Sequence, residues 1–278
     1  MGVYNIDGEL ITEDAIVYKK NTFVSIYLNA SSGEDTNDGL TTTTPVKTLE
    51  RAFELGLLKG NEFRIGITDS SNYTLAARTV TGICIHIFAP DGCYPTITFN
   101  QLAFYNCHIN FQGTATNSGI TILCTDSTNG WYTDNSYSIF KKCNINSVYK
   151  QNGGNLEIED CTLHDVKVNH ADVRLNNVRM GNSLGRINAI FLQQGGTLSI
   201  ESNGVSSVAT ELCSKMIDLD GVFANIQGSA SGDLSQFTTR INANASIVLG
   251  SSSYINSYGA TAVSGGGCIL DGKTFIKP

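Results

Sequence analysis

The sequence predicts an all-β fold, a parallel β-solenoid closed at its N-terminal end by one short helix. Short apolar alternations fill the chain after Gly60, for example FRIGIT at residues 63–68, and Gly, Asn, Asp and Ser separate them. Such runs at regular short spacing, with almost no helical pattern between them, are typical of strands. Only 15% of the residues are charged, as expected where turns and uncharged polar strand faces dominate the surface.

Three strand ends resemble one another and indicate a repeat. FYNCHIN, FKKCNIN and IEDCTLH are centred on Cys107, Cys143 and Cys161, and LNNVRMG, centred on Val178, is a weaker fourth. A short fixed period is typical of a solenoid, in which equivalent residues stack in ladders. The step from 107 to 143 is twice the later steps, so residues 112–138, which contain Cys124, form either another rung or one long loop.

The alternation within residues 156–163 predicts a corner. Leu156 and Ile158 point to one side of their strand, whereas Glu157 and Glu159 point to the other. Near Asp160 the alternation changes phase. A change of this kind is expected where the chain passes from one face of a solenoid to the next.

One stretch, residues 45–58, is predicted to be helical. Its apolar side chains fall at the i, i+3, i+4 and i+8 positions of one buried face: Leu49, Ala52, Phe53 and Leu57. Thr44 is the expected N-cap and Pro45 the expected first helical residue. The helix is expected to stop at Gly56 or Gly60.

The helix and the polar loop before it are predicted to cover the first rung, which would otherwise expose unpaired backbone groups and an apolar interior. Gly33 and Gly39 would supply tight turns, and Asp35, Asn37 and Asp38 would bind the loop's own backbone. The loop does not fit the calcium-binding pattern of an EF-hand.

The stretch IYLNASSGEDTNDGLTTTTPVKTLERAF, residues 26–53, resembles the opening of many pectate-lyase-like right-handed β-helix proteins, especially bacteriophage tail spikes and tail fibres. The matching positions are Tyr27, Gly33, Asp35, Gly39, Pro45, Lys47, Thr48, Leu49 and Ala52. The remainder of the chain resembles this class only in its general pattern of short alternating strands separated by turn residues. The resemblance implies a single-stranded right-handed parallel β-helix with an N-terminal cap, commonly a homotrimer, and carbohydrate recognition at a cell surface.

On this basis the chain divides into three parts. Residues 1–22 would be a lead-in that attaches to a phage tail or baseplate protein, residues 23–60 the capping strand, loop and helix, and residues 61–278 the β-helix with its closing strands. The N-terminus lacks the features of a signal peptide, and no apolar run approaches the ~18 residues of a membrane span. We therefore expect synthesis in the host cytoplasm, a final location in the virion tail, and no membrane insertion.

Composition argues against several other classes of partner. The net charge is −7 and no basic patch occurs, so no nucleic-acid partner is expected. The eight cysteines contain no CxxC pair and are expected to remain thiols. The histidines are expected to be structural or on the surface, and neither a metal nor a cofactor is predicted: His86, His108, His164 and His170.

Catalysis on a glycan would require paired carboxylates. Glu157 and Glu159, and likewise Asp218 and Asp220, lie two apart on one strand and would share its outward side at roughly 7 Å. That separation falls within the ~6.5–9.5 Å of inverting glycosidases. Outward carboxylates on strands are more often simply solvated, so these four are weak catalytic candidates.

Binding of a sugar would require aromatic side chains near polar ones. The segment NGWYTDNSY, residues 129–137, is expected to be a loop between strands and holds four candidates: Trp131, Tyr132, Asp134 and Tyr137. Aromatic rings stack on the apolar faces of sugars, and polar side chains bind the hydroxyl groups. In the alternative interpretation, Trp131 packs against the solenoid or at a trimer interface.

The sequence and the resemblance together favour a receptor-binding subunit of a bacteriophage tail spike or tail fibre that recognises bacterial surface polysaccharide. Two alternatives remain open. One is a glycan-degrading hydrolase or lyase on the same scaffold, and the other is a purely structural component of the virion.

Overall fold

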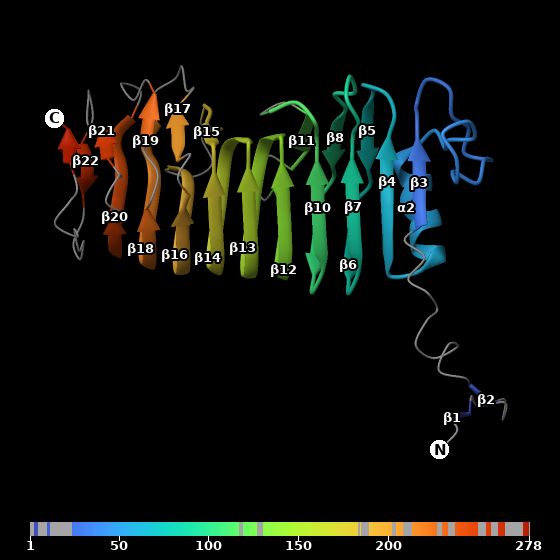
Figure 1. The fold of residues 1–278 in the computed structure, drawn as a ribbon, viewed down its shortest axis with the longest axis horizontal. Coiled ribbons are helices and arrows are strands. Elements are labelled where there is room, and N and C mark those ends of the chain that lie inside the picture. Colours follow the sequence, from blue (N-terminus) through green and yellow to red (C-terminus); the bar gives the residue numbers. More distant parts are fainter. Residues whose placement is uncertain are drawn as a thin grey trace.

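The chain forms one curled sheet of parallel strands, with a helix at the end where the sheet begins (Figure 1). The computed structural model describes residues 3–4, 10–11, 24–116, 119–126, 130–182, 184, 189–201, 204–207, 213–226, 230–232, 237–249, 254–256, 261–264 and 275–277. Within these residues 21 strands belong to this curled sheet, which confirms the predicted all-β class. No helix in this described part is long and apolar enough to cross a membrane.

The strands stack in chain order from the cap to the C-terminal end (Figure 1). The sheet contains β3 (Val24–Leu28), β4 (Glu62–Ile67), β5 (Asn72–Leu75), β6 (Arg78–Thr81), β7 (Cys84–Phe88), β8 (Thr96–Phe99), β9 (Leu102–Tyr105), β10 (His108–Gln112), β11 (Ile120–Cys124), β12 (Trp131–Lys141), β13 (Cys143–Glu159), β14 (Thr162–Asn176), β15 (Val178–Met180), β16 (Ala189–Ile200), β17 (Val205–Ser207), β18 (Cys213–Ile226), β19 (Ala230–Gly232), β20 (Phe237–Leu249), β21 (Tyr254–Asn256), β22 (Thr261–Ser264) and β23 (Phe275–Lys277). Of the proposed lead-in, the structure describes only β1 (Val3–Tyr4) and β2 (Leu10–Ile11), which pair antiparallel.

A corner in the left-handed backbone conformation recurs along the stack. Seven residues occupy it, with φ between 46° and 69°: Gly82, Asn106, Asn135, Gly153, His170, Gly195 and Gly221. The strand registers place them directly above one another, because their chain neighbours are paired. We call the chain from one such corner to the next a rung. Rungs run from 17 residues (153 to 170) to 29 residues (106 to 135).

Two buried glutamines hold this corner from inside. The Nε2 of Gln151 lies 2.9–3.2 Å from the carbonyl oxygens of Ser136, Gly153 and Asn155. Gln193 repeats the arrangement, at 2.9–3.1 Å, with the carbonyls of Ala171, Gly195 and Thr197. Both side chains are fully buried. They satisfy carbonyl groups that the corner turns inward, which would otherwise be costly to bury.

A second corner with positive φ follows the ends of β12, β13 and β14. It is formed by Lys142, Asp160 and Asn177. The corner predicted near Asp160 is therefore confirmed. The Nδ2 of Asn177 donates to Oδ1 of Asp160 over 2.6 Å, so side chains as well as backbone link adjacent rungs here.

The predicted repeat is correct for Cys143, Cys161 and Val178, which follow this second corner in register. It is wrong for Cys107, because β10 pairs with β12 so that Cys107 stacks on Ser136 instead. Residues 112–138 do not form one long loop: their described part includes β11 and the start of β12, which pair with the rungs on either side. The six cysteines whose side chains the structure describes are free thiols.

The helix α2 (Leu49–Lys59) covers the N-terminal end of the stack, where it packs on β3, β4 and β5, as predicted. Its buried face follows the 3.6-residue period through Leu49, Ala52, Phe53 and Gly56. A Cβ on Gly56 would lie 2.2 Å from the ring of Phe63 on β4. The predicted burial of Leu57 is wrong, since Leu57 is 43% exposed. The buried face of the helix includes Gly56 instead, which has no side chain.

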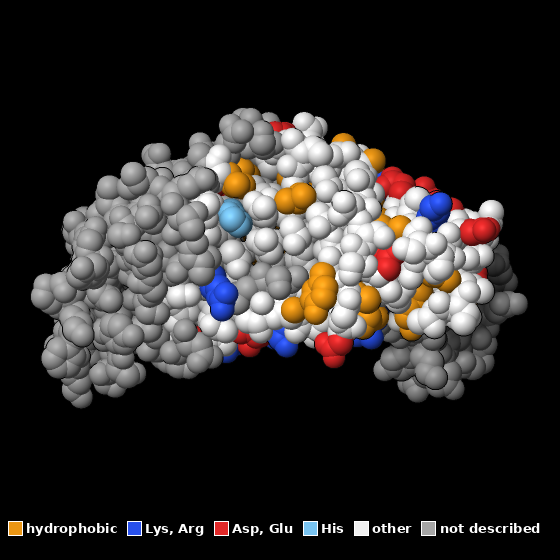
Figure 2. Space-filling model, turned by 90° about the horizontal axis from the view of Figure 1, so that it is seen from above, with side chains coloured by type: hydrophobic (Ala, Val, Ile, Leu, Met, Phe, Trp, Pro, Cys, Tyr) orange, Lys and Arg blue, Asp and Glu red, His pale blue; other side chains and the backbone are white. Residues whose placement is uncertain are grey.

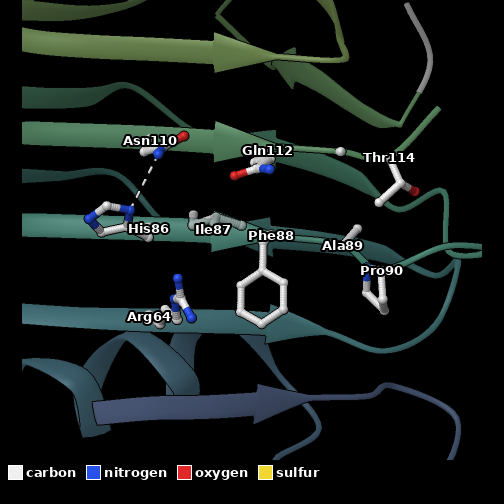
Figure 3. A pocket seen from close by; sticks show the side chains of 10 residues that line it. Arg64, His86, Ile87, Phe88, Ala89, Pro90, Asn110, Gln112 and Thr114 are labelled. Carbon is white, nitrogen blue, oxygen red and sulfur yellow. Dashed lines mark hydrogen bonds between the residues drawn. The ribbon is translucent and has the colours of Figure 1, made fainter. Parts of the chain in front are cut away.

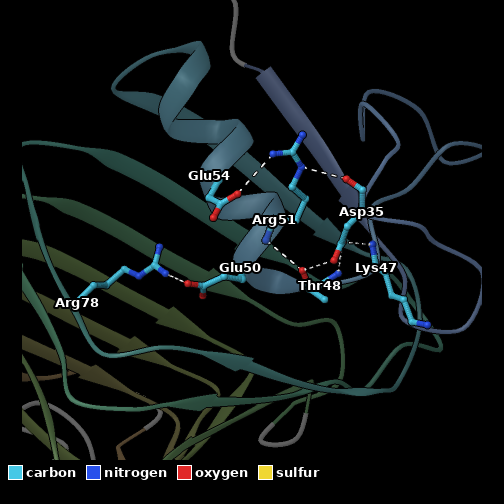
Figure 4. A network of polar contacts seen from close by, with 7 residues as sticks. All are labelled: Asp35, Lys47, Thr48, Glu50, Arg51, Glu54 and Arg78. Carbon is cyan, nitrogen blue, oxygen red and sulfur yellow. Dashed lines mark hydrogen bonds and ion pairs between the residues drawn. The ribbon is translucent and has the colours of Figure 1, made fainter.

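Asp35 organises the start of α2 (Figure 4). Its Oδ1 accepts hydrogen bonds from the backbone N–H groups of Lys47 and Thr48, both at 2.9 Å, and its Oδ2 accepts from the Thr48 hydroxyl. Thr48 in turn accepts from the N–H of Arg51 and is the N-cap. The prediction of an N-cap at Thr44 is wrong because the chain is still extended two residues later, where Val46 bridges to β3.

The rest of the cap agrees with the sequence. The helix ends at Gly60, one of its two predicted stops. Asn37 donates to the carbonyl of Pro45, and Asp38 accepts from the N–H of Leu40, so these side chains bind the loop's backbone as expected. Glu50 forms an ion pair with Arg78 of β6 (Figure 4), which ties the helix to the strands that begin the stack.

Gly153 allows a test of the left-handed corner alone, since an added Cβ would meet nothing closer than 3.8 Å. We expect Gly153→Val to lower the free energy of unfolding by about 1–2 kcal/mol, the cost of a left-handed residue with a Cβ. Gly153→Asn is the matched control and should cost less, because Asn tolerates this conformation. Urea unfolding would measure both, and equal losses in the two variants would contradict the assigned role of the corner.

Candidate functional site

Two residues after each left-handed corner, an outward row of side chains begins. We call this surface the Glu157 face. Its first column contains Glu62, Cys84, His108, Tyr137, Asn155, Asp172, Thr197 and Phe223. Its second contains Arg64, His86, Asn110, Ile139, Glu157, Arg174 and Ser199, and its third Phe88, Gln112, Lys141, Glu159 and Asn176. Side chains from distant segments thus form one continuous polar and aromatic surface.

Two shallow adjoining hollows lie in the middle of this face, and Glu157 and Arg174 border both. Their other polar lining residues are Tyr137, Lys141, Asn155, Glu159, Asp172 and Asn176. The Tyr137 hydroxyl donates to Oε1 of Glu157 over 2.7 Å. Arg174, whose side chain is 57% exposed, contacts Glu201 through Nε at 3.1 Å. The region offers an aromatic ring, a guanidinium, amides and carboxylates to one ligand.

Tyr137 is held in place from two sides. Its ring stacks on that of His108, with centroids 4.9 Å apart and an interplanar angle of 15°. The hydrogen bond to Glu157, followed by partial burial, raises the pKa of Tyr137. The phenol therefore stays protonated at neutral pH and keeps donating to the carboxylate.

Glu157 and Glu159 share the outward side of β13, as predicted, but Glu159 is committed to other partners. Its Oε2 lies 2.9 Å from Nζ of Lys141, and Asn176 donates to its Oε1 over 3.5 Å. The Lys141 ammonium is the main cause that lowers the pKa of Glu159. A general acid in glycoside hydrolysis needs a raised pKa, so Glu159 is poorly suited to that role.

Trp131 lies inside the fold and not in a loop. Residues 131–137 belong to β12, and the Trp131 side chain is fully buried. Its ring packs against Tyr149 and Phe99, with centroids 4.5 and 5.1 Å away, and its Nε1 donates to Ser147. The expectation of a loop is therefore wrong, and Trp131 offers no surface to a sugar.

Tyr132 and Asp134 lie on the other side of the left-handed corner, on a surface that we call the Asp134 face. Its outward columns are Tyr132, Lys150, Lys167, Leu192 and Asp218, and Tyr105, Asp134, Asn152, Asn169, Gln194 and Asp220. The Tyr132 hydroxyl contacts that of Tyr105. Tyr132 and Asp134 therefore do not form one platform with Tyr137, and Asp218 and Asp220 belong to a different face from Glu157.

Sequence reasoning suggested that Asp172 could join Glu157 and Glu159 across rungs, and Asp172 does line the same hollow as Glu157. It missed the part that His108 and Arg174 play in the Glu157 face. A signal for them was present. The segments QNGG and QQGG, at 151–154 and 193–196, mark two corners, and outward positions follow each corner at alternate residues.

The comparisons with known proteins add no relative. No family model, curated protein or solved structure matches this chain. In the described part of the side that Figure 2 shows, charged and hydrophobic side chains are scattered among mostly uncharged polar and backbone atoms.

The ion pair on the Glu157 face can be tested directly. Because Lys141 lowers the folded-state pKa of Glu159, the stability that the pair contributes is present at neutral pH and is lost as the pH falls through that pKa. Lys141→Met should raise the pKa of Glu159 towards its ordinary value in a carboxyl NMR titration. Lys150→Met, on the Asp134 face, should leave it unchanged; a Glu159 pKa that does not respond to Lys141→Met would disprove the coupling.

Proposed function

We propose that this protein is a receptor-binding subunit of a bacteriophage tail spike or tail fibre, folded as a right-handed parallel β-helix. The curled sheet of parallel strands supports the β-helix. Right-handed connections are the general rule between parallel strands, and the capping segment at residues 26–53 resembles the opening of this class. Residues 1–22 would attach the subunit to a tail or baseplate protein.

The ligand that we propose is bacterial surface polysaccharide, bound along the Glu157 face. The observation that carries this proposal is the row of aromatic, amide, guanidinium and carboxylate groups held in register around Tyr137 and Glu157. Aromatic rings and fixed polar groups together suit sugar rings with many hydroxyls. The hollows are shallow and succeed one another across strands, which favours an extended polymer over a small molecule.

The alternative function, glycan cleavage, rests on the same face. Glu157 borders both hollows and is the carboxylate best placed to reach a bound chain. The low pKa of Glu159 removes its nearest neighbour from the role of proton donor. Cleavage would therefore need Glu157 as the acid, with Glu159 or Asp172 as the base, and it stays the alternative to binding.

Binding and cleavage are separated by one experiment on capsule and lipopolysaccharide extracts from a panel of candidate host bacteria. We expect the parent protein to bind one extract without shortening its chains. Tyr137→Ala and Arg174→Ala should each weaken binding about tenfold or more, as for residues central to an interface. Lys150→Ala, on the Asp134 face, is the matched control and should bind normally.

Other outcomes would change the proposal. Shortened glycan chains that disappear in Glu157→Gln would establish the enzyme. Binding that survives both Tyr137→Ala and Arg174→Ala would place the glycan elsewhere on the molecule. A parent protein that neither binds nor cleaves any extract would favour the purely structural role.

We further propose a homotrimer. Leu57 and Leu58, 43% and 77% exposed on the outer side of α2, and Phe223, 53% exposed on the Glu157 face, provide apolar surface for a neighbouring subunit. Light scattering on the purified chain should then give three times the mass of one chain. A monomer mass at micromolar concentration would exclude the trimer.

A further inference from the structure

Three side chains with metal-binding atoms meet at the N-terminal end of the Glu157 face. Cys84 and His86 lie on β7, and His108, opposite Cys84 in the register, lies on β10. One ligand atom from each lies within 4.8 Å of the other two. We propose that Cys84, His86 and His108 bind one transition-metal ion, with Zn²⁺ as the preferred ion. Calcium and magnesium are disfavoured because they prefer oxygen ligands, whereas thiolate and imidazole suit zinc.

The positions are close to those that zinc requires. The Sγ of Cys84 lies 3.4 Å from Nε2 of His86. In a tetrahedral site with a Zn–S distance of about 2.3 Å and a Zn–N distance of about 2.0 Å, sulfur and nitrogen lie about 3.5 Å apart. These two ligands therefore need almost no movement, and a modest rotation of the His108 side chain would complete the set.

Asn110 supplies the partner that orients His86 (Figure 3). Its Nδ2 lies 3.3 Å from Nδ1 of His86, while its Oδ1 is buried with no hydrogen-bond partner. Turning the amide by half a revolution gives Oδ1 a partner, because Oδ1 then accepts from the Nδ1–H of His86. Nε2 is left with its lone pair on the side of Cys84, the usual arrangement of a metal-bound histidine.

His108 carries a second unsatisfied atom. Its ring lies between Tyr137 and His86, with centroids 4.9 and 5.4 Å away. Its Nε2 is buried without a hydrogen-bond partner. A buried polar atom without a partner is costly, and a metal bond at this imidazole would remove that cost.

His86 and Cys84 are uncharged in the metal-free protein. Burial, followed by His108 and Arg64, lowers the pKa of His86, so the imidazole is neutral at neutral pH. Burial, followed by Glu62 and Cys107, raises the pKa of Cys84 to about 11, so a bound metal would displace one proton. The Arg64 guanidinium lies over the Phe88 ring, 5.3 Å from its centroid. Water or the Glu62 carboxylate, next to Cys84 in register, would complete the coordination.

The site lies outside the two hollows of the Glu157 face but adjoins them through His108, which stacks on Tyr137; its effect would be structural. Zinc bound here would link β7 to β10 across two rungs close to the cap. Since the three side chains are only half-buried, an ion can reach them from solvent.

The test uses the whole chain, treated with a chelator and then titrated with Co²⁺, whose spectrum reports thiolate ligation and tetrahedral geometry. We expect one ion per chain, displaced by Zn²⁺, and a thermal unfolding midpoint that rises with Zn²⁺. Cys84→Ser should abolish the thiolate-to-cobalt band, and His108→Gln should weaken binding at least tenfold. Asn110→Ala should weaken it about 10–100-fold, as expected for a residue that positions a ligand.

Cys93→Ser is the matched control, because Cys93 is a half-buried thiol outside the cluster. It should bind Co²⁺ like the parent. Circular dichroism would establish that each variant keeps its β structure. Binding of less than half an ion per chain, or a Co²⁺ spectrum that survives unchanged in a folded Cys84→Ser protein, would overturn the proposal.

Discussion

The left-handed corner is the constraint on which the rest of the structure depends. At seven successive positions the chain adopts the same conformation, which Gly and Asn tolerate better than most other residues. Gln151 and Gln193 bind the carbonyls that two of these corners turn inward. Because every rung leaves the corner in the same direction, the residue two positions later always points outward. The columns of the Glu157 face follow from this single regularity.

The sequence predicted the features that depend on local chemistry. Loop carboxylates and amides that bind nearby backbone, a helix with one apolar face, and a phase change at Asp160 can all be recognised within a few residues. Leu57 was misassigned because the helix leaves room for the Phe63 ring at Gly56, and no local pattern contains that contact. Trp131 was misassigned because a strand whose outward residues are Tyr, Asp and Asn has the composition of a loop.

The candidate sites were harder to predict because their members lie one rung apart. Glu157 and Glu159 are close in the sequence and were found, whereas Tyr137 and Glu157 are joined only by the pairing of β12 with β13. His86 and His108 are likewise brought together by the register of β7 and β10. Rung length varies from 17 to 29 residues, so no fixed spacing in the sequence reveals these neighbours. Aligning the corner residues first would have revealed them.

The repeated corner also has a consequence for how such a molecule changes over generations. A segment that begins and ends in the same conformation can be duplicated or lost as a whole without disturbing the segments on either side. Each such event would lengthen or shorten the Glu157 face by one strand, about 4.8 Å, and would add or remove three of the outward side chains of that face. The length of polymer that the face can contact would therefore change by whole rungs. The side chains within a rung could change independently of that length.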